Sequence, residues 1–470
     1  MTASDTICAV CTPPGRGAIA MLRLSGPDAI GVADKVFRPQ RQGARLADTP
    51  PRTLHYGTVV DADGEVVDDV VVSLFRAPGS YTGEDIVEVS CHGSRLVQRR
   101  ILQILIDAGA RMAEAGEFTK RAFVNGKMDL SQAEAVADMI AAESEAARRV
   151  AYSQMRGGFS RQLAELRGQL VHFASLVELE LDFSEEDVEF ADRVELTSLL
   201  DHILNVVTRL ADSFRRGNAI KGGVPTAIVG APNVGKSTLL NALLCEERAI
   251  VSDVQGTTRD TIEETLDIGG LAFRLIDTAG IRAASDSVEA EGIRRSMAAA
   301  ERAMVVVVVA DATEGADAAR SAAAKISSLL KADEQSLIVA LNKADMCETA
   351  TLSWADDAWR REVGAAAVVA MSARRGDGLD ELRAAMVEAV EGGMATSSDD
   401  IVVTNARHYE ALTEARGALL RVCAGLRSGA GGELLSSDLR DVTEALASIT
   451  GEVSSQDVLN NIFKNFCIGK

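Results

Sequence analysis

The sequence lacks a surplus of basic residues and lacks any long apolar run. Its 470 residues carry 49 Lys and Arg against 69 Asp and Glu, a net charge of −20, which excludes a broad basic surface for nucleic acid. No apolar run reaches the roughly 18–20 residues of a membrane span. The most apolar run, residues 304–310, has the length of a strand. Any role with nucleic acid therefore needs a local patch or a partner protein.

Cysteines are few and follow no framework spacing. Seven are scattered along the chain, as expected of a protein of the reducing cytoplasm. Cys8 and Cys11 form one C-x-x-C pair, but no second pair completes a zinc site, and in a strand the two side chains would point to opposite faces. The first residues contain neither a basic segment nor an apolar stretch, so we expect no signal peptide.

Length and residue pattern divide the chain into parts. At about 100–200 residues per domain, two to four domains are expected. Residues 1–125 mix short β-rich runs with turns and one helical stretch, which predicts an α+β domain. Residues 126–216 contain no proline after residue 130 and repeat apolar residues at helical spacing, as in Leu163, Leu166, Leu170 and Phe173. This second part is predicted to be helical.

Strands and helices alternate from residue 217 to residue 392. The expected strands are 227–229, 272–276, 304–310, 337–341 and 367–370, a pattern typical of a doubly wound α/β unit with a parallel sheet. Residues 393–400 have the composition of a linker, and the tail to residue 470 is helical, with Leu412, Ala415, Leu419 and Val422 on one face. The α/β unit is thus inserted between two helical stretches. We expect these stretches to form one discontinuous domain, because neither alone buries much core.

An acidic stretch runs from Glu178 to Glu189, with seven acidic and no basic residues. One interpretation is a solvated helix end and loop. The other is a docking surface for a basic partner.

A phosphate-binding loop is indicated by residues 230–237, G-A-P-N-V-G-K-S. They follow an apolar strand and open an apolar helix, which is the context that supports the G-x-x-x-x-G-K-S motif. Backbone N–H groups and the helix N-terminus would cradle the phosphates. We expect Lys236 to reach the β- and γ-phosphates and the Ser237 hydroxyl to bind Mg²⁺.

Three further motifs follow later strands in a fixed order: D-T-A-G at 277–280, N-K-A-D at 342–345, and Ser372-Ala373. The Asp345 carboxylate would accept hydrogens from N1–H and the 2-amino group of guanine, a pair of donors that adenine lacks. Lys343 would pack over the ring, and a backbone N–H of Ser372-Ala373 would reach guanine O6. The sequence therefore predicts binding of GTP in preference to ATP.

The residues that would act at the γ-phosphate differ from the Ras pattern. G-T-T-R-D at 256–260 lies where a switch loop closes over Mg²⁺, and Thr258 is the expected second hydroxyl ligand. Asp277 would hold the Mg²⁺ shell, and the Gly280 N–H would sense the γ-phosphate. Ras-type enzymes orient water with a glutamine directly after that glycine, but here the residue is Ile281. The Asn233 side-chain oxygen is suited to a monovalent cation that replaces the charge of an arginine finger.

Motifs outside the α/β unit carry a resemblance that covers the whole chain. They are T-P-P-G-R-G at 12–17, Y-T-G-E-D at 81–85, C-H-G at 91–93, G-E-F-T-K-R-A-F-V-N-G-K at 116–127, and the terminal C-I-G-K at 467–470. Together with the phosphate loop and G-T-T-R-D, they resemble the MnmE (TrmE) family of tRNA uridine-modification GTPases.

The resemblance implies a multidomain α/β architecture. It has an N-terminal α+β folate-binding and dimerisation domain (1–125), an all-α domain in two parts (126–216 and 393–470), and an inserted Ras-like P-loop GTPase domain (217–392). It implies a cytoplasmic homodimer that forms a heterotetramer or larger complex with the flavoprotein MnmG. That complex would add an aminomethyl or carboxymethylaminomethyl group at C5 of the tRNA wobble uridine, using carbon from a tetrahydrofolate derivative (5-formyl- or 5,10-methylene-tetrahydrofolate).

The resemblance also assigns site residues. GTP hydrolysis would require Mg²⁺ and K⁺, with K⁺ held by Asn233, Ser252, Thr257 and the backbone carbonyl of Val254. The expected catalytic residues are Glu289, which would position water, Lys236 and Cys467. The expected folate ligands are Arg23, Glu88, Lys127 and Lys470. The residues expected around GTP are Asn233, Val234, Gly235, Lys236, Ser237, Thr238, Ser252, Asp253, Val254, Gln255, Gly256, Thr257, Thr258, Asp277, Thr278, Ala279, Gly280, Asn342, Lys343, Ala344, Asp345, Ser372, Ala373 and Arg374.

Other interpretations stay open at this point. Taken alone, Glu289 is a solvated carboxylate at a helix start, Arg23 and Lys127 are surface charges, and Cys467 is a structural thiol. For the whole chain, the alternatives are a GTP-dependent RNA-binding switch in ribosome assembly and a GTPase scaffold whose N-terminal domain binds only protein. The net charge of −20 and the terminal C-I-G-K argue against the ribosome-assembly switch.

Overall fold

The computed structural model describes residues 5–41, 43–182, 193–247, 264–276, 289–331, 334–347, 354–391, 401–428, 430–453, 456–464, 466 and 469. The chain divides into two compact units. The first comprises residues 1–140, 153–203 and 414–470, and the second comprises residues 141–152 and 204–413. Across the described ranges, no helix combines the length and the apolar character needed to cross a bilayer.

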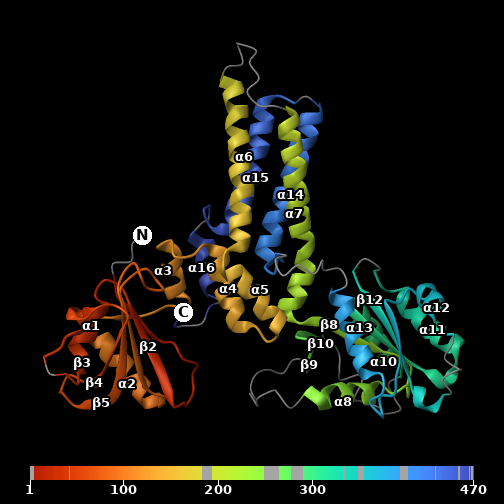
Figure 1. Ribbon diagram of the computed structural model, residues 1–470, viewed down its shortest axis with the longest axis horizontal. Helices are drawn as coiled ribbons and strands as arrows, with labels where there is room; N and C mark the ends of the chain where they lie inside the picture. Colours follow the sequence, from red (N-terminus) through yellow and green to blue (C-terminus); the bar gives the residue numbers. More distant parts are fainter. Residues whose placement is uncertain are drawn as a thin grey trace. The chain divides into compact units, whose positions relative to one another are not determined.

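A seven-stranded sheet forms the N-terminal part of the first unit (Figure 1). Its strand order is β3-β4-β5-β6-β2-β1-β7, and every neighbouring pair is antiparallel except β1 and β7. Helices α1 and α2 pack on one face, and α3 covers the other face at β1. The elements are β1 (Ile7–Val10), β2 (Ile19–Ser25), α1 (Ala29–Val36), β3 (Phe37–Pro39), β4 (Thr53–Val60), β5 (Val66–Phe75), β6 (Ile86–His92), α2 (Arg95–Asp107), β7 (Arg111–Met112) and α3 (Glu117–Val124).

Strand β1 alternates between two cores, as a pleated strand does. Cys8 faces the core under α1 and α2, whereas Ile7 and Ala9 pack with Phe118 on the other side. Cys11 lies beyond the end of β1, and its thiol donates a hydrogen bond of 3.1 Å to the carbonyl of Gly469. Among the described residues, no cluster of three or more His, Cys, Asp or Glu is arranged to hold a metal.

Helices from both sides of the α/β insert come together in the first unit, while residues 145–152 of α5, 204–222 of α7 and 406–413 of α14 belong to the second. Helix α6 packs along α15, and Glu178 of α6 accepts hydrogen bonds from Ser436 and Arg440 of α15 (Figure 1). The apolar positions expected on these helices are buried: Leu163, Leu166, Leu170, Phe173, Leu412, Ala415, Leu419 and Val422. The helices are α4 (Leu130–Ala141), α5 (Glu145–Met155), α6 (Gly158–Asp182), α7 (Arg193–Gly222), α14 (Ala406–Ser428), α15 (Gly432–Thr450) and α16 (Gln456–Lys464).

The second unit contains a six-stranded sheet in the order β13-β12-β11-β8-β10-β9. The five strands expected from the sequence are present and mutually parallel. An edge strand, β9, is antiparallel to β10, so the sheet is mixed rather than purely parallel. The elements are β8 (Val224–Val229), α8 (Lys236–Glu247), β9 (Glu264–Ile268), β10 (Leu271–Leu275), α10 (Glu289–Arg302), β11 (Val305–Asp311), α11 (Ala316–Ser327), β12 (Ser336–Asn342), α12 (Asp357–Glu362), β13 (Ala367–Ala370) and α13 (Leu379–Glu391).

Helices cover both faces of this sheet. Helices α8 and α13 pack on one face, and α10, α11 and α12 pack on the other. Residues 141–152 join the first of these cores through Ala147 of α5, and the Ala146 amide donates a hydrogen bond of 2.9 Å to the carbonyl of Gly270. The domain boundary expected between residues 216 and 217 lies inside α7, which continues to Gly222.

Candidate functional site

The nucleotide motifs emerge from one edge of the second sheet. The phosphate loop follows the carboxyl end of β8, and Asn342 is the last residue of β12. Ser372 and Ala373 follow β13. Because β8, β12 and β13 run parallel, their carboxyl ends lie along the same edge, where ligands bind in folds of this type. The topology therefore brings together motifs that are more than a hundred residues apart in sequence.

The phosphate loop has backbone conformations that few residue types adopt. Gly235 has φ of +99°, and a Cβ placed there would lie 2.2 Å from Nδ2 of Asn342. Asn233 has φ of +62°, in the left-handed region that asparagine tolerates better than most residues, and its side chain is exposed. Helix α8 begins directly after the loop, at Lys236, so its free N–H groups lie at the loop.

Lys236 closes this loop on itself. Its Nζ donates hydrogen bonds of 2.8 Å to the carbonyl of Gly230 and 2.6 Å to the carbonyl of Ala231. Burial of the ammonium group lowers the pKa of Lys236 below its ordinary value. A half-buried cation whose partners in the described part of the chain are neutral carbonyls is well suited to an anion such as a phosphate.

Asn342 joins the phosphate loop to the loop after β13. Its side chain is buried, and Nδ2 donates a hydrogen bond of 2.7 Å to the carbonyl of Val234. Its Oδ1 accepts a hydrogen bond of 2.9 Å from the Ala373 amide. Both ends of the amide group are thus used to hold loops in place.

A backbone N–H of Ser372 or Ala373 is expected to reach guanine O6, but both N–H groups already donate hydrogen bonds within the protein. The Ala373 amide donates to Asn342, and the Ser372 amide donates over 2.8 Å to the carbonyl of Asp377. A guanine carbonyl would have to displace Asn342 or bind elsewhere on the loop. Asp345 lies beside this loop with its side chain 15% exposed, 3.3 Å from Nε of Arg375.

Some predicted nucleotide residues lie outside the described residues. These are Ser252, Asp253, Val254, Gln255, Gly256, Thr257, Thr258, Asp277, Thr278, Ala279 and Gly280. The structure describes Glu289 as the first residue of α10 but does not describe its side chain. Most of the acidic stretch, from residue 183 onward, also lies outside the described ranges.

In the first unit, Arg23 and Glu88 form a cross-strand pair between β2 and β6. Nε and an Nη atom of Arg23 lie 2.9 Å and 2.7 Å from the same oxygen, Oε1 of Glu88. The guanidinium lies 5.5 Å from the ring centre of Tyr81 and 5.6 Å from that of Phe118. Lys127 packs against Gly83 and donates a hydrogen bond of 3.0 Å to the carbonyl of Pro78. Two of the expected folate ligands, Arg23 and Lys127, thus meet the loop of residues 78–85, and a third, Glu88, pairs with Arg23.

Arg121 is a residue of this region that the sequence reasoning did not single out. Its side chain is 5% exposed and contacts the carboxylates of Asp5, Glu84 and Glu117. It therefore ties the segment before β1, the 78–85 loop and α3 together. Its place within the quoted 116–127 motif was the available signal.

The C-terminal segment is anchored in the first unit. Phe463 is buried against Leu130 and Ala133, and Ile462 and Phe466 pack at the rim of the same cluster, as their spacing predicts. Gly469 is buried, with φ of +102°, and a Cβ there would lie 2.5 Å from the carbonyl oxygen of Val10. The neighbouring positions of interest, Cys467 and Lys470, lie outside the described residues.

Comparison with known proteins identifies the family. The family profile described as GTP-binding protein TrmE N-terminus matches residues 6–127, and the profile for the MnmE helical domain matches residues 130–467. The tRNA modification GTPase MnmE of Parabacteroides distasonis is 51% identical over 470 residues, which cover 99% of this chain and 100% of that protein. The chain belongs to the MnmE family. The MnmE of Bacteroides thetaiotaomicron is 49% identical over 99% of both chains.

Membership of the MnmE family makes the chain a GTP-binding protein and a GTPase. It confirms the expected multidomain α/β fold with an inserted P-loop unit. Among solved structures, Era in complex with MgGDPNP and a segment of 16S ribosomal RNA is 30% identical over 41% of this chain and 65% of that chain, with a TM-score of 0.27.

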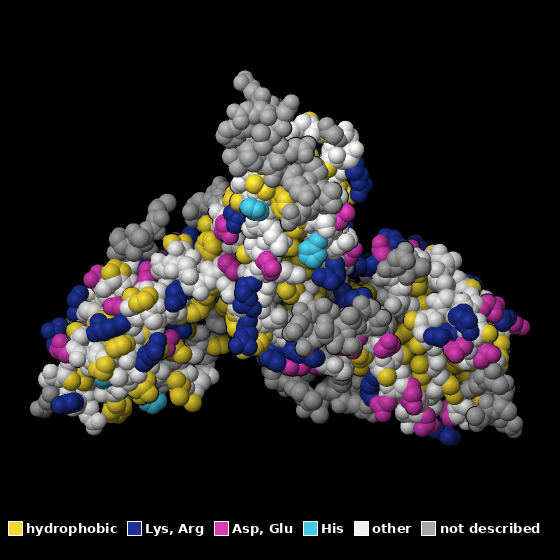
Figure 2. Space-filling model, turned by 45° about the horizontal axis from the view of Figure 1, so that its top comes forward, with side chains coloured by type: hydrophobic (Ala, Val, Ile, Leu, Met, Phe, Trp, Pro, Cys, Tyr) yellow, Lys and Arg dark blue, Asp and Glu magenta, His cyan; other side chains and the backbone are white. Residues whose placement is uncertain are grey.

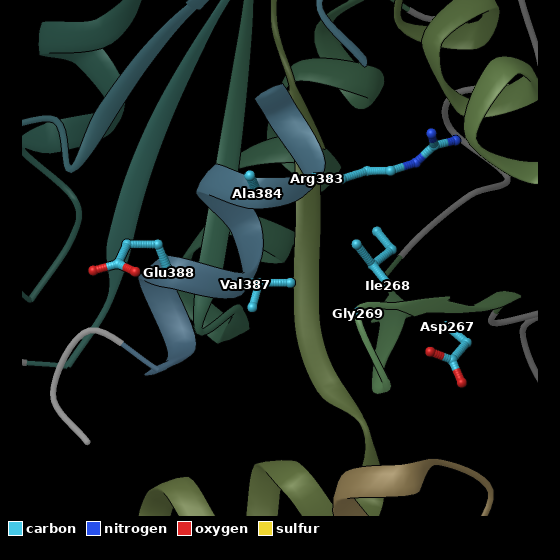
Figure 3. A pocket seen from close by; sticks show the side chains of 7 residues that line it. All are labelled: Asp267, Ile268, Gly269, Arg383, Ala384, Val387 and Glu388. Atoms are coloured by element: carbon cyan, nitrogen blue, oxygen red, sulfur yellow. The ribbon is translucent and has the colours of Figure 1, made fainter. Parts of the chain in front are cut away.

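A pocket of about 520 Å³ lies away from the nucleotide edge of this MnmE-family chain (Figure 3). It is lined by the turn between β9 and β10 and by α13: Asp267, Ile268, Gly269, Arg383, Ala384, Val387 and Glu388. The turn precedes β10, whereas the nucleotide motifs follow the carboxyl ends of the parallel strands. The pocket is therefore not the GTP site.

Proposed function

We propose that this chain is a K⁺-dependent GTPase of tRNA modification that works in the cytoplasm with the flavoprotein MnmG. The complex adds an aminomethyl or carboxymethylaminomethyl group at C5 of the wobble uridine, using carbon from a methylene-tetrahydrofolate. One observation carries the GTP part: buried Asn342 bonds both to the phosphate loop at Val234 and to the loop at Ala373. The tRNA part is supported by the MnmE relatives, which match from end to end.

The metal ions of this proposal are supported by the chemistry of the donors. Ser237, at the start of α8, offers a hydroxyl to Mg²⁺, with Thr258 as the second hydroxyl. Asn233, exposed on the phosphate loop, offers a neutral carbonyl oxygen to K⁺, with Ser252, Val254 and Thr257 as further oxygen donors. A bound K⁺ supplies positive charge where other GTPases use an arginine.

The protein's own groups divide the work of hydrolysis. Lys236 leaves its carbonyl partners in the loop and binds the β- and γ-phosphates. The N-terminus of α8 stabilises phosphate charge through its free N–H groups. Glu289, at the start of α10, orients the attacking water.

The folate site of this proposal lies around Arg23 and Glu88. Both Arg23 contacts go to Oε1 of Glu88, and among the described residues no hydrogen bond is made to Oε2. That oxygen is available to the donor edge of a pterin ring, while Lys127 and Lys470 hold the glutamate tail. Cys467 completes the site from the chain end.

Homodimerisation is supported by an open face of the first sheet. The face opposite α1 and α2 exposes Leu54 by 72% and Tyr56 by 51%, on β4, and Val71 by 37%, on β5. Tyr56 and Val71 are register partners, so these side chains are neighbours. We assign a second copy of this chain as their cover, because an exposed apolar patch on a sheet marks an interaction surface.

The acidic net charge of the chain supports the proposal that a partner protein helps to bind tRNA. Acidic and basic side chains are interspersed over the α/β part on the face seen in Figure 2, and the whole chain carries a net charge of −20. MnmG therefore supplies much of the tRNA-binding surface in this proposal.

The deciding experiment is mass analysis of tRNA nucleosides from cells that lack this protein. Loss of the C5-modified wobble uridine, restored by the intact gene, is the expected result. Unchanged wobble uridines with abnormal ribosome assembly would instead favour the RNA-binding switch.

A further inference from the structure

The carboxylate of Asp311 is buried at the nucleotide edge of the second sheet. Asp311 is the last residue of β11 and pairs in register with Asn342, the last residue of β12. Its side chain is 8% exposed. None of the four nucleotide motifs includes this residue, so its burial at that edge needs its own explanation.

The two oxygens of this carboxylate accept hydrogen bonds from different residues. Oδ1 accepts hydrogen bonds of 3.0 Å from the amide and 2.7 Å from the hydroxyl of Thr313, in the 3-10 turn Ala312–Glu314. Oδ2 accepts a hydrogen bond of 2.5 Å from Nζ of Lys343. Thr313 thus fixes the carboxylate from one side, and the carboxylate fixes the lysine from the other.

Lys343 is the residue expected to pack over the guanine ring. Its backbone has φ of +63°, and its side chain is only 33% exposed. A free lysine side chain loses rotamer entropy when it is held in one conformation. Contact with Asp311 removes much of that freedom before the nucleotide arrives.

Electrostatics agree with a fixed ion pair. Burial acts to raise the pKa of Asp311, but hydrogen bonds from Lys343 and Thr313 outweigh it, and the pKa lies below its ordinary value. The neighbouring carboxylate, Asp345, faces Arg375 instead. The two acidic groups near the base therefore have different cationic partners.

We propose that Asp311 is a positioning residue for guanine-nucleotide binding, acting through Lys343 and itself held by Thr313. This inference rests on the GTP site described under the proposed function. It predicts a particular specificity. Since Lys343 contacts the ring face and not the 2-amino group, loss of Asp311 weakens GDP and IDP equally. Loss of Asp345, in contrast, weakens GDP more than IDP.

The test measures GDP and IDP affinity of the full-length chain by calorimetry. Asp311→Asn keeps the shape and the acceptor for Thr313 but turns a donor toward Lys343. We expect about fivefold weaker binding of both nucleotides, the size of a partly exposed ion pair. Asp317→Asn is the matched control, because Asp317 pairs with Arg320 on the surface of α11 and should leave both affinities unchanged.

A double-mutant cycle separates positioning from a structural role. In a Lys343→Ala background, Asp311→Asn should cause no further loss, whereas a merely structural role would persist. The inference is overturned if Asp311→Asn binds GDP like the unmodified chain, if its effect survives in the Lys343→Ala background, or if it changes the GDP-to-IDP ratio.

A second variant guards against misfolding. Thr313→Val removes one donor from the carboxylate and retains the side-chain volume, and we expect roughly twofold weaker GDP binding that vanishes in the Lys343→Ala background. Unchanged GDP affinity in this variant would count against the inference. If the unmodified chain bound ADP as tightly as GDP, the proposed guanine site would be wrong. That outcome would overturn the proposed function and is distinct from a failure of the Asp311 inference.

Discussion

The side chain of Asn342 lies so close to the backbone of Gly235 that only a glycine fits there. The position a Cβ would take on Gly235 is 2.2 Å from Nδ2 of Asn342, and the same Nδ2 donates to the neighbouring carbonyl of Val234. One amide group, that of Asn342 at the end of β12, therefore joins this strand to the phosphate loop. A substitution at either residue should therefore disturb both the phosphate loop and the loop after β13.

Gly235→Ala should disrupt GDP binding. The φ of +99° strains an alanine by about 1–2 kcal/mol, and the new methyl group displaces Asn342 from its bond to the loop. We expect at least about tenfold weaker GDP binding in calorimetry. Gly417→Ala, in α14, is the control, because a Cβ there meets nothing within 4 Å. Equal GDP affinities for the two variants would show that the contact between Asn342 and the phosphate loop is not needed for binding.

GTP hydrolysis should require K⁺. Ile281 stands where Ras-type enzymes have a water-orienting glutamine, and in the proposed site Asn233 on the phosphate loop holds a cation that supplies the charge of an arginine finger. We expect rates in K⁺ on the order of 100-fold above those in Na⁺, the size of a lost transition-state charge contact. Phosphate release at equal ionic strength measures this. Equal rates in the two salts would exclude the cation.

Asp345→Asn should relax base selectivity. In the proposed site the carboxylate accepts two guanine hydrogens, and its loss should cost on the order of 1.5–3 kcal/mol of GTP binding. IDP, which lacks the 2-amino group, should lose less. Calorimetry with both nucleotides decides, and an unchanged GDP-to-IDP ratio would rule out the assigned role.

Glu289→Ala should slow hydrolysis and leave binding intact. A residue that orients water acts mainly on kcat, and we expect a fall on the order of 100-fold. Steady-state kinetics in K⁺ buffer separate kcat from KM. An effect confined to KM would indicate a binding or structural role, and no effect would return Glu289 to a solvated carboxylate.

Deletion of residues 467–470 should abolish tRNA modification and spare GTP hydrolysis. The nucleotide motifs all lie between residues 230 and 374, in the second unit, whereas the tail is anchored through Phe463 in the first. Nucleoside analysis of tRNA is compared with the K⁺-stimulated rate of the same protein. Normal wobble-uridine modification by the truncated chain would contradict the proposal that residues 467–470 contribute to the folate site.

Periodicity predicted the elements of the second sheet but missed its edge. Strands such as 304–310 are continuous apolar runs, because a parallel strand is buried on both faces. β9 instead alternates, with Leu266 and Ile268 buried and its other residues more exposed. The Gly269-Gly270 pair that follows is a hairpin signal, and it was available in the sequence.

Contacts within the site were harder to predict than its motifs. The residue types of N-K-A-D and Ser372-Ala373 indicate guanine, but the partner of each amide depends on how loops meet in three dimensions. Asn342 takes the Ala373 amide only because β12 and β13 end at the same edge. Asp311 gave no motif signal at all, since its role depends on a contact with Lys343, thirty-two residues away.

The burial of Gly469 has a practical consequence for how this protein is handled. Its carbonyl accepts a hydrogen bond from the Cys11 thiol, and its backbone lies against Val10. A purification tag fused close behind this buried glycine would strain its contacts with Val10 and Cys11. Untagged ends are therefore a condition for reading any variant of Cys467 or Lys470 as an effect of the residue rather than of the fusion.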